Sequence, residues 1–435
     1  MEFFSPIAIS VFVFLFVLGS IIFEFIDKAL VVLLGVVILL FTGVLSPEEV
    51  LPMVDSGTIL LLMGMMILVE GVRESRILSW MNVKIIEKTE GNPLLLFFIF
   101  SFLTFFLSTF LANATTMMVI IPLTIAVTQG IGISPKPYLI SEIFFANIGG
   151  TLTLIGDPTN VMIGSANGFS FLTFLQNMWI PISLLSTAVI SLLVFKDWEV
   201  VKPIKKSLPK LFMSNLLIQK IKEEFVNEKF SLPFAIKTAI ILSITVLMII
   251  IQPFQFPIEY IAVSGAVFLL VFLKKYLSPE KVFAMVDWHT LLFFSGLFIV
   301  VGTLEKVGAL EKVSEIILHF ANSPLTLGLS VLWAIGLLSG FVENIPLVAM
   351  MIPVLKNIIA SGQITGNLEM VWFALSLGAC LGGNGSLIGS SASMIGAQMA
   401  ERYGVKISFR EFFKYGFPVT ILSLSIASVF LFFVL

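Results

Sequence analysis

Long apolar stretches dominate this chain and restrict it to folds that a lipid bilayer can accommodate. Six stretches are long enough to cross about 30 Å of hydrocarbon, at residues 6–23, 28–45, 57–72, 235–251, 257–273 and 288–303. Two more simple spans are expected at 171–195 and 413–434. Only 12% of the 435 residues are charged, about half the share of a soluble domain. The sequence therefore predicts an all-α, multi-pass protein of the cytoplasmic membrane, with the lipid bilayer as a partner.

Charge and ligand content argue against several other classes of protein. The formal net charge of −2 is too close to neutral for a nucleic-acid partner. Cys380 is the single cysteine, and His289 and His319 are the only histidines, so Cys and His cannot assemble a zinc or haem centre. Neither a nucleotide-binding loop nor a Ser/His/Asp set is present, and we therefore expect no enzyme and no cofactor beyond a coupling ion.

Four less regular segments lie between the simple spans. Residues 93–128 and 324–359 are apolar with a polar interruption, and each is expected to form a re-entrant hairpin. Residues 138–166 and 370–397 contain glycine clusters and are expected to form broken helices. Irregular backbone at membrane depth persists only where it lines a cavity or is buried in protein. The four interruptions are therefore the candidate binding segments.

The two halves of the chain repeat each other. Ser46-Pro47-Glu48 recurs as Ser278-Pro279-Glu280, and the Gly149-Gly150 motif recurs as Gly382-Gly383. If the hairpins do not cross, each half crosses five times, so the second half lies inverted, as in many transporters. We expect an inverted repeat of about five plus five helices, with residues 1–195 as the first unit and 235–435 as the second.

The distribution of basic residues gives an expected orientation. Lys and Arg cluster on one side of the predicted spans, which the positive-inside rule assigns to the cytoplasm, so both termini are expected outside. The cytoplasmic linker 196–234 contains apolar residues at helical spacing among Lys and Glu. It is predicted to hold an interfacial amphipathic helix, with a solvated connector as the alternative. Residues 304–323 are interpreted as an outer loop.

The hairpin tips and helix breaks supply the candidate ligands. Amide, hydroxyl and carboxylate oxygens at the tips suit hard cations such as Na⁺. Unwound helices expose carbonyls to cations and amide ends to anions, and we expect Gly149-Gly150-Thr151 to be unwound. Pro346 is expected to interrupt the helix after Asn344. The candidate substrate- and ion-binding residues are Asn113, Thr115, Thr116, Asn147, Gly149, Gly150, Thr151, Thr153, Asp157, Asn160, Glu343, Asn344, Gly382, Gly383, Asn384, Ser386 and Ser390. The candidate Na⁺ ligands among them are Asn113, Gly150, Asn344 and Gly383.

Ionisable residues within predicted spans are expensive and point to function. Glu343 is the stronger candidate, because no Lys or Arg lies near it in sequence; Asp157 is either a ligand or the N-cap of a returning half-helix. Further carboxylates are assigned ordinary roles, with Glu70 and Glu142 near water at span ends and Asp55 and Asp287 as N-caps. His289 is placed at the membrane interface, with pH sensing as an alternative.

These motifs resemble the ion transporter superfamily, in particular the branch of arsenite permeases, the pigment-cell P protein and one group of Na⁺/H⁺ antiporters, which is related to the divalent anion:sodium symporters. The resemblance rests on residues 110–117, 147–160, 342–346 and 378–389, so it extends over both halves. It implies an elevator-type secondary transporter, commonly a homodimer. Two departures affect ion stoichiometry: Ala112 stands where relatives have Asp, and Glu343 where Asp is usual.

Three transport functions follow as hypotheses. The leading one is movement of a small inorganic ion or oxyanion of the arsenite or antimonite type, coupled to H⁺ or Na⁺. Na⁺/H⁺ antiport through Asp157 and Glu343 is the second, and Na⁺-coupled uptake of a dicarboxylate or other anion is the third. A channel would need only a continuous pore, whereas the paired breaks and tips favour a carrier.

Overall fold

The computed structural model describes residues 5–23, 25–77, 92–203, 231–252 and 256–434, and all regular structure in these ranges is helical. Five of the helices are long and apolar enough to cross a membrane: α4 (Ser56–Glu74), α10 (Phe171–Lys196), α13 (Leu232–Ile251), α16 (Trp288–Lys306) and α22 (Phe409–Val434). Three predicted spans form shorter apolar helices, namely α1 (Pro6–Ile22), α2 (Lys28–Phe41) and α14 (Ile258–Phe272). The all-helical fold class is thus confirmed.

Each of the four irregular segments is interrupted, as predicted, although the first broken helix is interrupted after its glycine pair and not at it. The first hairpin consists of α6 (Pro93–Ser108) and α7 (Asn113–Gly130), and the second of α18 (Pro324–Ser339) and α19 (Asn344–Ala360). The first broken helix consists of α8 (Lys136–Leu152) and α9 (Pro158–Asn167), and the second of α20 (Glu369–Gly382) and α21 (Ser391–Arg402). The same succession of elements therefore occurs in each half of the chain.

Local sequence explains where these helices begin. Pro93, Pro158 and Pro324 each occupy the first helical turn, where the missing N–H of proline costs nothing. The preceding residues cap the helices, since the side chains of Asn92, Asp157 and Ser323 accept hydrogen bonds from backbone amides of the first turn. Pro346 also lies in a first turn, that of α19. Because proline is tolerated in the first turn of a helix, the expectation that Pro346 interrupts the helix was wrong.

Short helices connect the main ones. α3 (Pro47–Val50) and α15 (Pro279–Met285) begin at the proline of the repeated Ser-Pro-Glu motifs, and α11 (Trp198–Val201) follows α10. The expected outer loop 304–323 instead contains α17 (Ala309–Phe320), which meets α18 at an angle of 117°. Residues 204–230 of the predicted linker lie outside the described residues.

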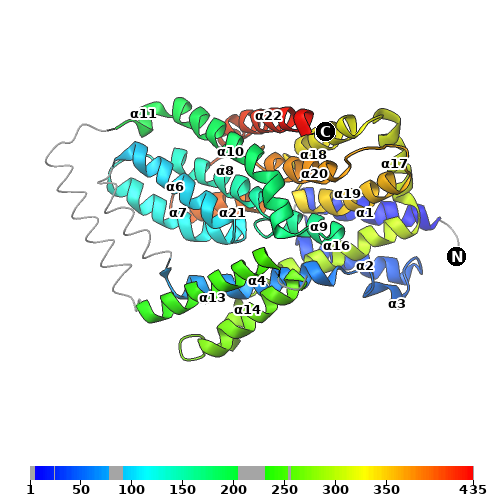
Figure 1. The fold of residues 1–435 in the computed structure, drawn as a ribbon, viewed down its shortest axis with the longest axis horizontal. Coiled ribbons are helices and arrows are strands. Elements are labelled where there is room, and N and C mark those ends of the chain that lie inside the picture. The colour runs from blue at the N-terminus through cyan, green and yellow to red at the C-terminus, as the bar shows by residue number, and fades with distance from the viewer. Residues whose placement is uncertain (1–4, 24, 78–91, 204–230, 253–255, 435) are drawn as a thin grey trace.

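The helices form two groups (Figure 1). The hairpin bundle comprises α6 to α10 and α18 to α22, in which α20 packs on α18 and α22, and α8 packs on α6, α7 and α10. The flanking group comprises α1, α2, α4, α13, α14 and α16, in which α4 packs on α14 and α2 on α16. α9 and α19 connect the two, because they contact α4 and α16.

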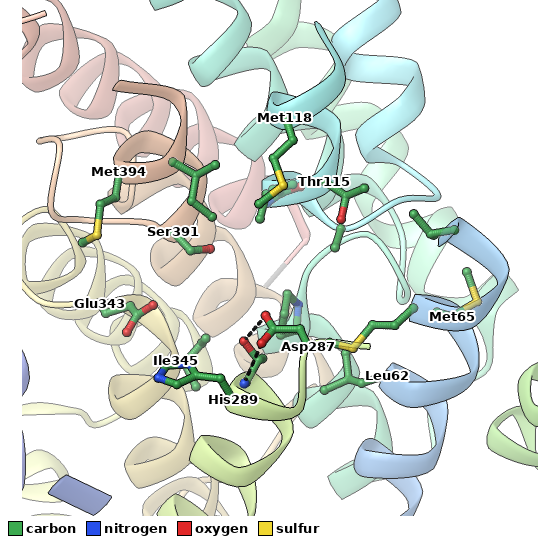
Figure 2. Close-up of a pocket in the computed structure, with 18 of the residues that line it drawn as sticks. Leu62, Met65, Thr115, Met118, Asp287, His289, Glu343, Ile345, Ser391 and Met394 are labelled. Atoms are coloured by element: carbon green, nitrogen blue, oxygen red, sulfur yellow. Dashed lines mark hydrogen bonds between the residues drawn. The ribbon is translucent and has the colours of Figure 1, made fainter. Parts of the chain in front are cut away.

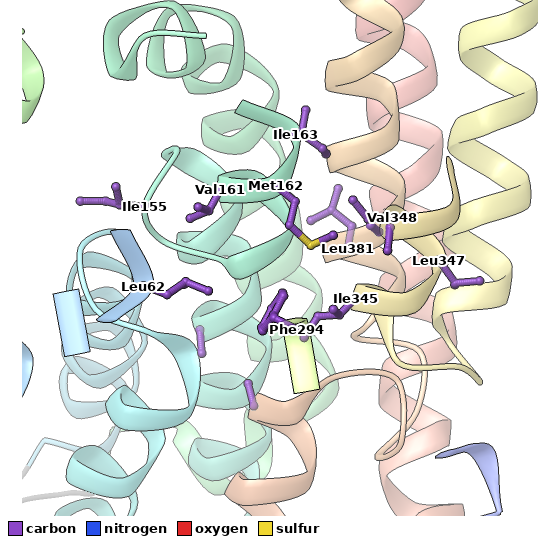
Figure 3. Packing of buried hydrophobic residues seen from close by; sticks show 14 of the residues in the cluster. Leu62, Ile155, Val161, Met162, Ile163, Phe294, Ile345, Leu347, Val348 and Leu381 are labelled. Atoms are coloured by element: carbon purple, nitrogen blue, oxygen red, sulfur yellow. The ribbon is translucent and has the colours of Figure 1, made fainter. Parts of the chain in front are cut away.

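Buried apolar side chains fill the contact between the groups. Val161 and Met162 of α9 pack near Val348 of α19 and Leu381 of α20, with Phe294 of α16 close by (Figure 3). Lipid tails are as apolar as these side chains, so close van der Waals packing, and not removal from water, stabilises this contact. This core holds the ends of the broken helices at the junction of the two groups.

Candidate functional site

A cavity of about 710 Å³ lies between the hairpin bundle and the flanking group. One wall comes from the tips and breaks, through residues such as Asn113, Gly156, Glu343 and Ser391; the other comes from α2, α4 and α16. Figure 2 shows Thr115 and Met118 of α7 on one side and Glu343 and His289 on another. Segments distant in sequence thus converge on one space.

Asn113 and Asp157 form the centre of the first half of the site. Asn113 is the first residue of α7, and its Nδ2 donates to Asp157 Oδ2 at 2.8 Å. Its Oδ1 accepts a hydrogen bond from the hydroxyl of Ser108. Asp157 also caps α9, because its Oδ1 accepts from Thr159 N at 3.0 Å and Thr159 Oγ1 at 2.6 Å. Asp157 is therefore both an N-cap and a partner of the hairpin tip.

Asn147 joins the two halves. Its Nδ2 donates to Asn384 Oδ1 at 2.8 Å and to Ser390 Oγ at 2.9 Å, both in the second break. Its Oδ1 is 3.5 Å from Asn113 Nδ2. Among the described residues, no hydrogen-bond partner is found for Asn384 Nδ2, although the side chain is fully buried. A polar chain thus runs from Asp157 through the first hairpin tip into the second break.

Asn160 forms hydrogen bonds with backbone carbonyls on both sides of the start of the first break. Its Nδ2 donates to the carbonyls of Gly150 at 3.0 Å and Thr153 at 2.9 Å, and its Oδ1 accepts from Ser376 Oγ at 2.6 Å. Thr153 Oγ1 in turn donates to the carbonyl of Thr109 at 2.5 Å in the hairpin turn. The Gly150 carbonyl, a candidate Na⁺ ligand, therefore already accepts a hydrogen bond in this conformation.

Glu343 carries the charge of the second tip and is paired across the cavity. It is the N-cap residue of α19, and its Oε1 is 2.9 Å from Lys28 Nζ at the start of α2. The carboxylate side chain is only 8% exposed. The expectation that no cation neutralises Glu343 was wrong, because the partner is distant in sequence and close in space.

The flanking group contributes further charged groups to the cavity. His289 Nε2 of α16 is 2.6 Å from Asp27 Oδ2, the carboxylate that also caps α2. Arg73 Nη1 of α4 is 3.2 Å from Glu70 Oε2, and Asp287 also lines the cavity. Lys28 and Arg73 were missed in the sequence because each stands at a span end, where basic residues ordinarily face water.

Comparison with known proteins identifies the family of the chain. A family model described as "Citrate transporter" (CitMHS) matches residues 15–378. The chain belongs to the CitMHS family. A 46 kDa membrane protein of Mycobacterium leprae is 31% identical over 98% of both chains. The P protein of mouse is 30% identical over 98% of this chain and 60% of its own length. The resemblance to the ion transporter superfamily is thereby confirmed.

The fold has a counterpart among solved structures. The YdaH transporter of Alcanivorax borkumensis superposes with a TM-score of 0.60, covering 98% of this chain and 97% of its own, at 15% identity. This likeness concerns the fold alone. Membership of the CitMHS family makes the protein a multi-pass membrane transporter.

The remaining predicted site residues of this CitMHS protein divide into three sets. Thr115 lines the cavity, and Gly383 and Ser390 lie in the second break and at the cap of α21. The others lie behind the cavity wall: Thr116, Gly149, Gly150, Thr151, Asn344, Gly382, Asn384 and Ser386. Thr116 Oγ1 has no hydrogen-bond partner among the described residues. Cavity lining and structural support are thus separate roles within the predicted set.

The glycine pair of the first break has a different role from the one expected. Gly149, Gly150 and Thr151 continue α8, and the break comes at residues 153–157. A Cβ on Gly149 would meet the Phe105 carbonyl oxygen at 2.2 Å, and one on Gly150 would meet Asn113 Oδ1 at 2.5 Å. These glycines therefore let the helix approach the hairpin closely. In the second half, Gly382 likewise belongs to α20, whereas Gly383 and Gly385 lie in the break itself.

Two carboxylates predicted near water are buried. Glu142 is fully buried in α8, where Thr124 Oγ1 donates to its Oε1; its Oε2 has no partner among the described residues. Glu70 is 6% exposed and lines the cavity. The expectation failed because both environments are tertiary features: α7 packs over Glu142 of α8, and Glu70 of α4 faces the cavity between the helix groups.

Proposed function

We propose that the protein is a secondary active transporter that couples movement of a small anion to Na⁺ or H⁺. The observation that carries this proposal is the convergence of both hairpin tips and both helix breaks on one cavity. Helix breaks that face a cavity can present backbone carbonyl and amide groups to an ion. Glu343 and Asn113, which line the cavity at the two hairpin tips, are the proposed coupling-ion ligands.

The anion has two candidate classes. The sequence resemblance favours an arsenite- or antimonite-type oxyanion, whereas membership of a family described as citrate transporters favours a carboxylate such as citrate. The cavity volume of about 710 Å³ falls within the usual range for small-molecule sites, about 300–1,000 Å³. Arsenite would leave most of this space to water, whereas a di- or tricarboxylate would fill more of it and could bind basic residues that line it, such as Lys28. We therefore place carboxylates first.

The mode of transport follows from the two helix groups. We propose that the hairpin bundle moves as a unit against the flanking group, in a homodimer, with the second half inverted relative to the first. We also propose the sequence units 1–195 and 235–435 as the repeats and an extracytoplasmic position for both termini. The contact through α9 and α19 is the surface along which this movement would occur.

Uptake into proteoliposomes tests the proposal. The panel comprises citrate, succinate, arsenite and Na⁺, each under an imposed Na⁺ gradient and an imposed pH gradient. We expect saturable uptake of citrate or succinate that depends on one gradient. Saturable arsenite uptake would restore the oxyanion class, and absence of uptake for every solute would reject secondary transport of these classes.

Na⁺/H⁺ antiport is the second candidate, favoured by the direct contact of Asp157 with Asn113 at 2.8 Å. Here Asp157 and Glu343 would exchange the two cations without an anion. Reconstituted Asp157→Asn and Glu343→Gln variants should then lose Na⁺-dependent proton flux. Unchanged flux in both variants would exclude antiport through these carboxylates.

A further inference from the structure

The ion pair of Lys28 and Glu343 joins the two helix groups across the cavity. Lys28 is the first residue of α2 in the flanking group, and Glu343 precedes α19 at the tip of the second hairpin. Their side chains are 29% and 8% exposed, with Nζ and Oε1 2.9 Å apart. Both groups line the cavity. The pair therefore occupies the space where solutes would bind.

The other charges of the cavity already have partners within their own helix group. Asp27 is paired with His289 and accepts from Ala29 N at 3.0 Å. Arg73 is paired with Glu70 on the same helix. Lys28 also lies 5.2 Å from the centroid of the Phe293 ring. Among the ion pairs described at this cavity, that of Lys28 and Glu343 alone connects the flanking group to a hairpin tip.

Taking away one partner of a partly buried ion pair, and leaving the other charge in place, costs free energy. Removing one partner leaves an unpaired charge, which is strongly unfavourable in a fully buried setting and less so here because Lys28 is 29% exposed. A cation on Glu343 would leave the ammonium unpaired, and an anion on Lys28 would leave the carboxylate unpaired. When both ions bind together, each charge keeps a partner.

We propose that Lys28 is the anion-binding residue and that its pairing with Glu343 makes binding of anion and Na⁺ mutually dependent. Na⁺ takes the carboxylate of Glu343, a hard oxygen ligand, and the released ammonium receives a carboxylate of the anion. This inference rests on the proposed function and specifies its coupling ion. In the absence of both solutes, the ion pair holds the hairpin tip against α2.

Calorimetric titration of the purified full-length protein tests the coupling. Citrate and succinate are titrated in Na⁺ or in choline at equal ionic strength. We expect Na⁺ to raise wild-type anion affinity at least fivefold, the lower end of typical coupling between sites. Glu343→Gln should bind the anion with the same affinity in both media, because Lys28 is already free. Lys28→Gln should lose anion binding and keep thermal stabilisation by Na⁺.

Controls separate folding from recognition. Lys136→Gln removes a lysine of similar exposure that pairs with Glu411 outside the cavity, and it should titrate like the wild type. The double variant Lys28→Glu with Glu343→Lys exchanges the two charges, so it keeps an ion pair and should fold. It should lose thermal stabilisation by Na⁺, because the carboxylate is no longer on the tip of the second hairpin.

Three results would overturn the inference: wild-type anion binding independent of Na⁺, continued Na⁺ dependence in Glu343→Gln, or unchanged anion binding in Lys28→Gln. Proteoliposome uptake distinguishes this failure from failure of the proposed function. If the wild type transports an anion while Lys28→Gln binds it normally, the assignment of Lys28 fails alone. If the wild type neither binds nor transports any anion of the panel, both fail.

Discussion

At the scale of single residues, Asp157 combines a structural and a chemical role. Its carboxylate caps α9 and accepts from the Asn113 amide. Asn is as good an N-cap as Asp, so Asp157→Asn should keep the cap of α9, lose the hydrogen bond from Asn113, and lose coupled transport. Asp157→Ala should lose the cap as well as coupled transport, with a stability cost of about 0.5–2 kcal/mol for the missing cap. Thermal unfolding and proteoliposome uptake measure the two effects; full transport by Asp157→Asn would leave Asp157 with the capping role alone.

The buried pair of Thr124 and Glu142 allows a second residue-level prediction. In the sequence repeat, Leu355 and Leu375 stand at the corresponding positions of the second half, and both are buried. Thr124→Val should destabilise the protein by about 1–3 kcal/mol, because it removes the described partner of a buried carboxyl group. Thr124→Leu with Glu142→Leu should be nearly neutral, since both polar groups are then replaced.

Thermal unfolding of the detergent-solubilised variants compares these substitutions. The double variant serves as the control for the single one. A double variant as unstable as Thr124→Val would show that the cost comes from packing of the side chains rather than from the unpaired carboxyl group.

At this scale, the sequence predicted contacts between residues close in the chain and did not predict partners far apart in the chain. The N-cap roles of Asp55 and Asp287 are confirmed, since each accepts from the amide and hydroxyl of the threonine three residues later. The contact of Lys28 with Glu343 spans 315 positions in the chain. Local spacing could indicate a cap, but it could not indicate which helix would bring a lysine to a hairpin tip.

At the scale of elements, close approach of helices depends on glycine in both halves. A Cβ on Gly149 would lie 2.2 Å from the Phe105 carbonyl oxygen, and one on Gly382 would lie 2.3 Å from that of Gly336. Gly149→Ala should therefore push α8 away from α6 and destabilise the protein by about 1–3 kcal/mol, as overpacking does.

Gly19 in α1 is the matched control, because a Cβ there meets nothing within 4 Å. Gly19→Ala should leave the unfolding temperature unchanged or raise it slightly, given the higher helix propensity of alanine. Equal destabilisation by both substitutions would refute the packing explanation.

The contact between α3 and α16 gives a pH-dependent prediction. Lys306 Nζ lies 2.6 Å from the Glu49 carboxylate. The hydrogen bond from Lys306, together with hydrogen bonds from Ser46, lowers the pKa of Glu49 from 4.5 to about 2. A lowered pKa stabilises the folded state above the unfolded pKa, and this stabilisation is lost as the pH falls.

Unfolding temperatures of the wild type and Glu49→Gln should differ at pH 6 and converge between pH 4.5 and 2. At pH 6, the wild type is expected to be more stable than Glu49→Gln. A difference that stays constant down to pH 2 would show that the Glu49 carboxylate does not contribute through its charge.

The existence of the elements was more predictable than their ends. Apolar length and polar interruptions were enough to predict both hairpins and both broken helices. The place of the first break was wrong, because glycine in a membrane helix serves either unwinding or close packing, and the choice depends on the neighbour α6. The helix α17 was missed because its charged residues suggested a loop.

At the scale of the whole molecule, the account rests on two helix groups that meet at a shared cavity. The internal repeat in the sequence predicted that four segments would converge, and these segments supply one wall of the cavity. The opposite wall, formed by α2, α4 and α16, could not be predicted, because nothing in the sequence specifies how the first three helices of each half pack on the bundle.

Labelling of engineered cysteines tests this convergence most directly. The native Cys380 is buried and is replaced by Ser, and single cysteines are then introduced at Thr115 and Ser391, which line the cavity on α7 and α21. Phe102, 65% exposed on α6 and outside the cavity, is the control position. We predict that a water-soluble thiol reagent labels positions 115 and 391 in proteoliposomes and that the transported anion protects both. Labelling that is absent at both positions, or unaffected by an anion that the same vesicles transport, would contradict a shared transport site.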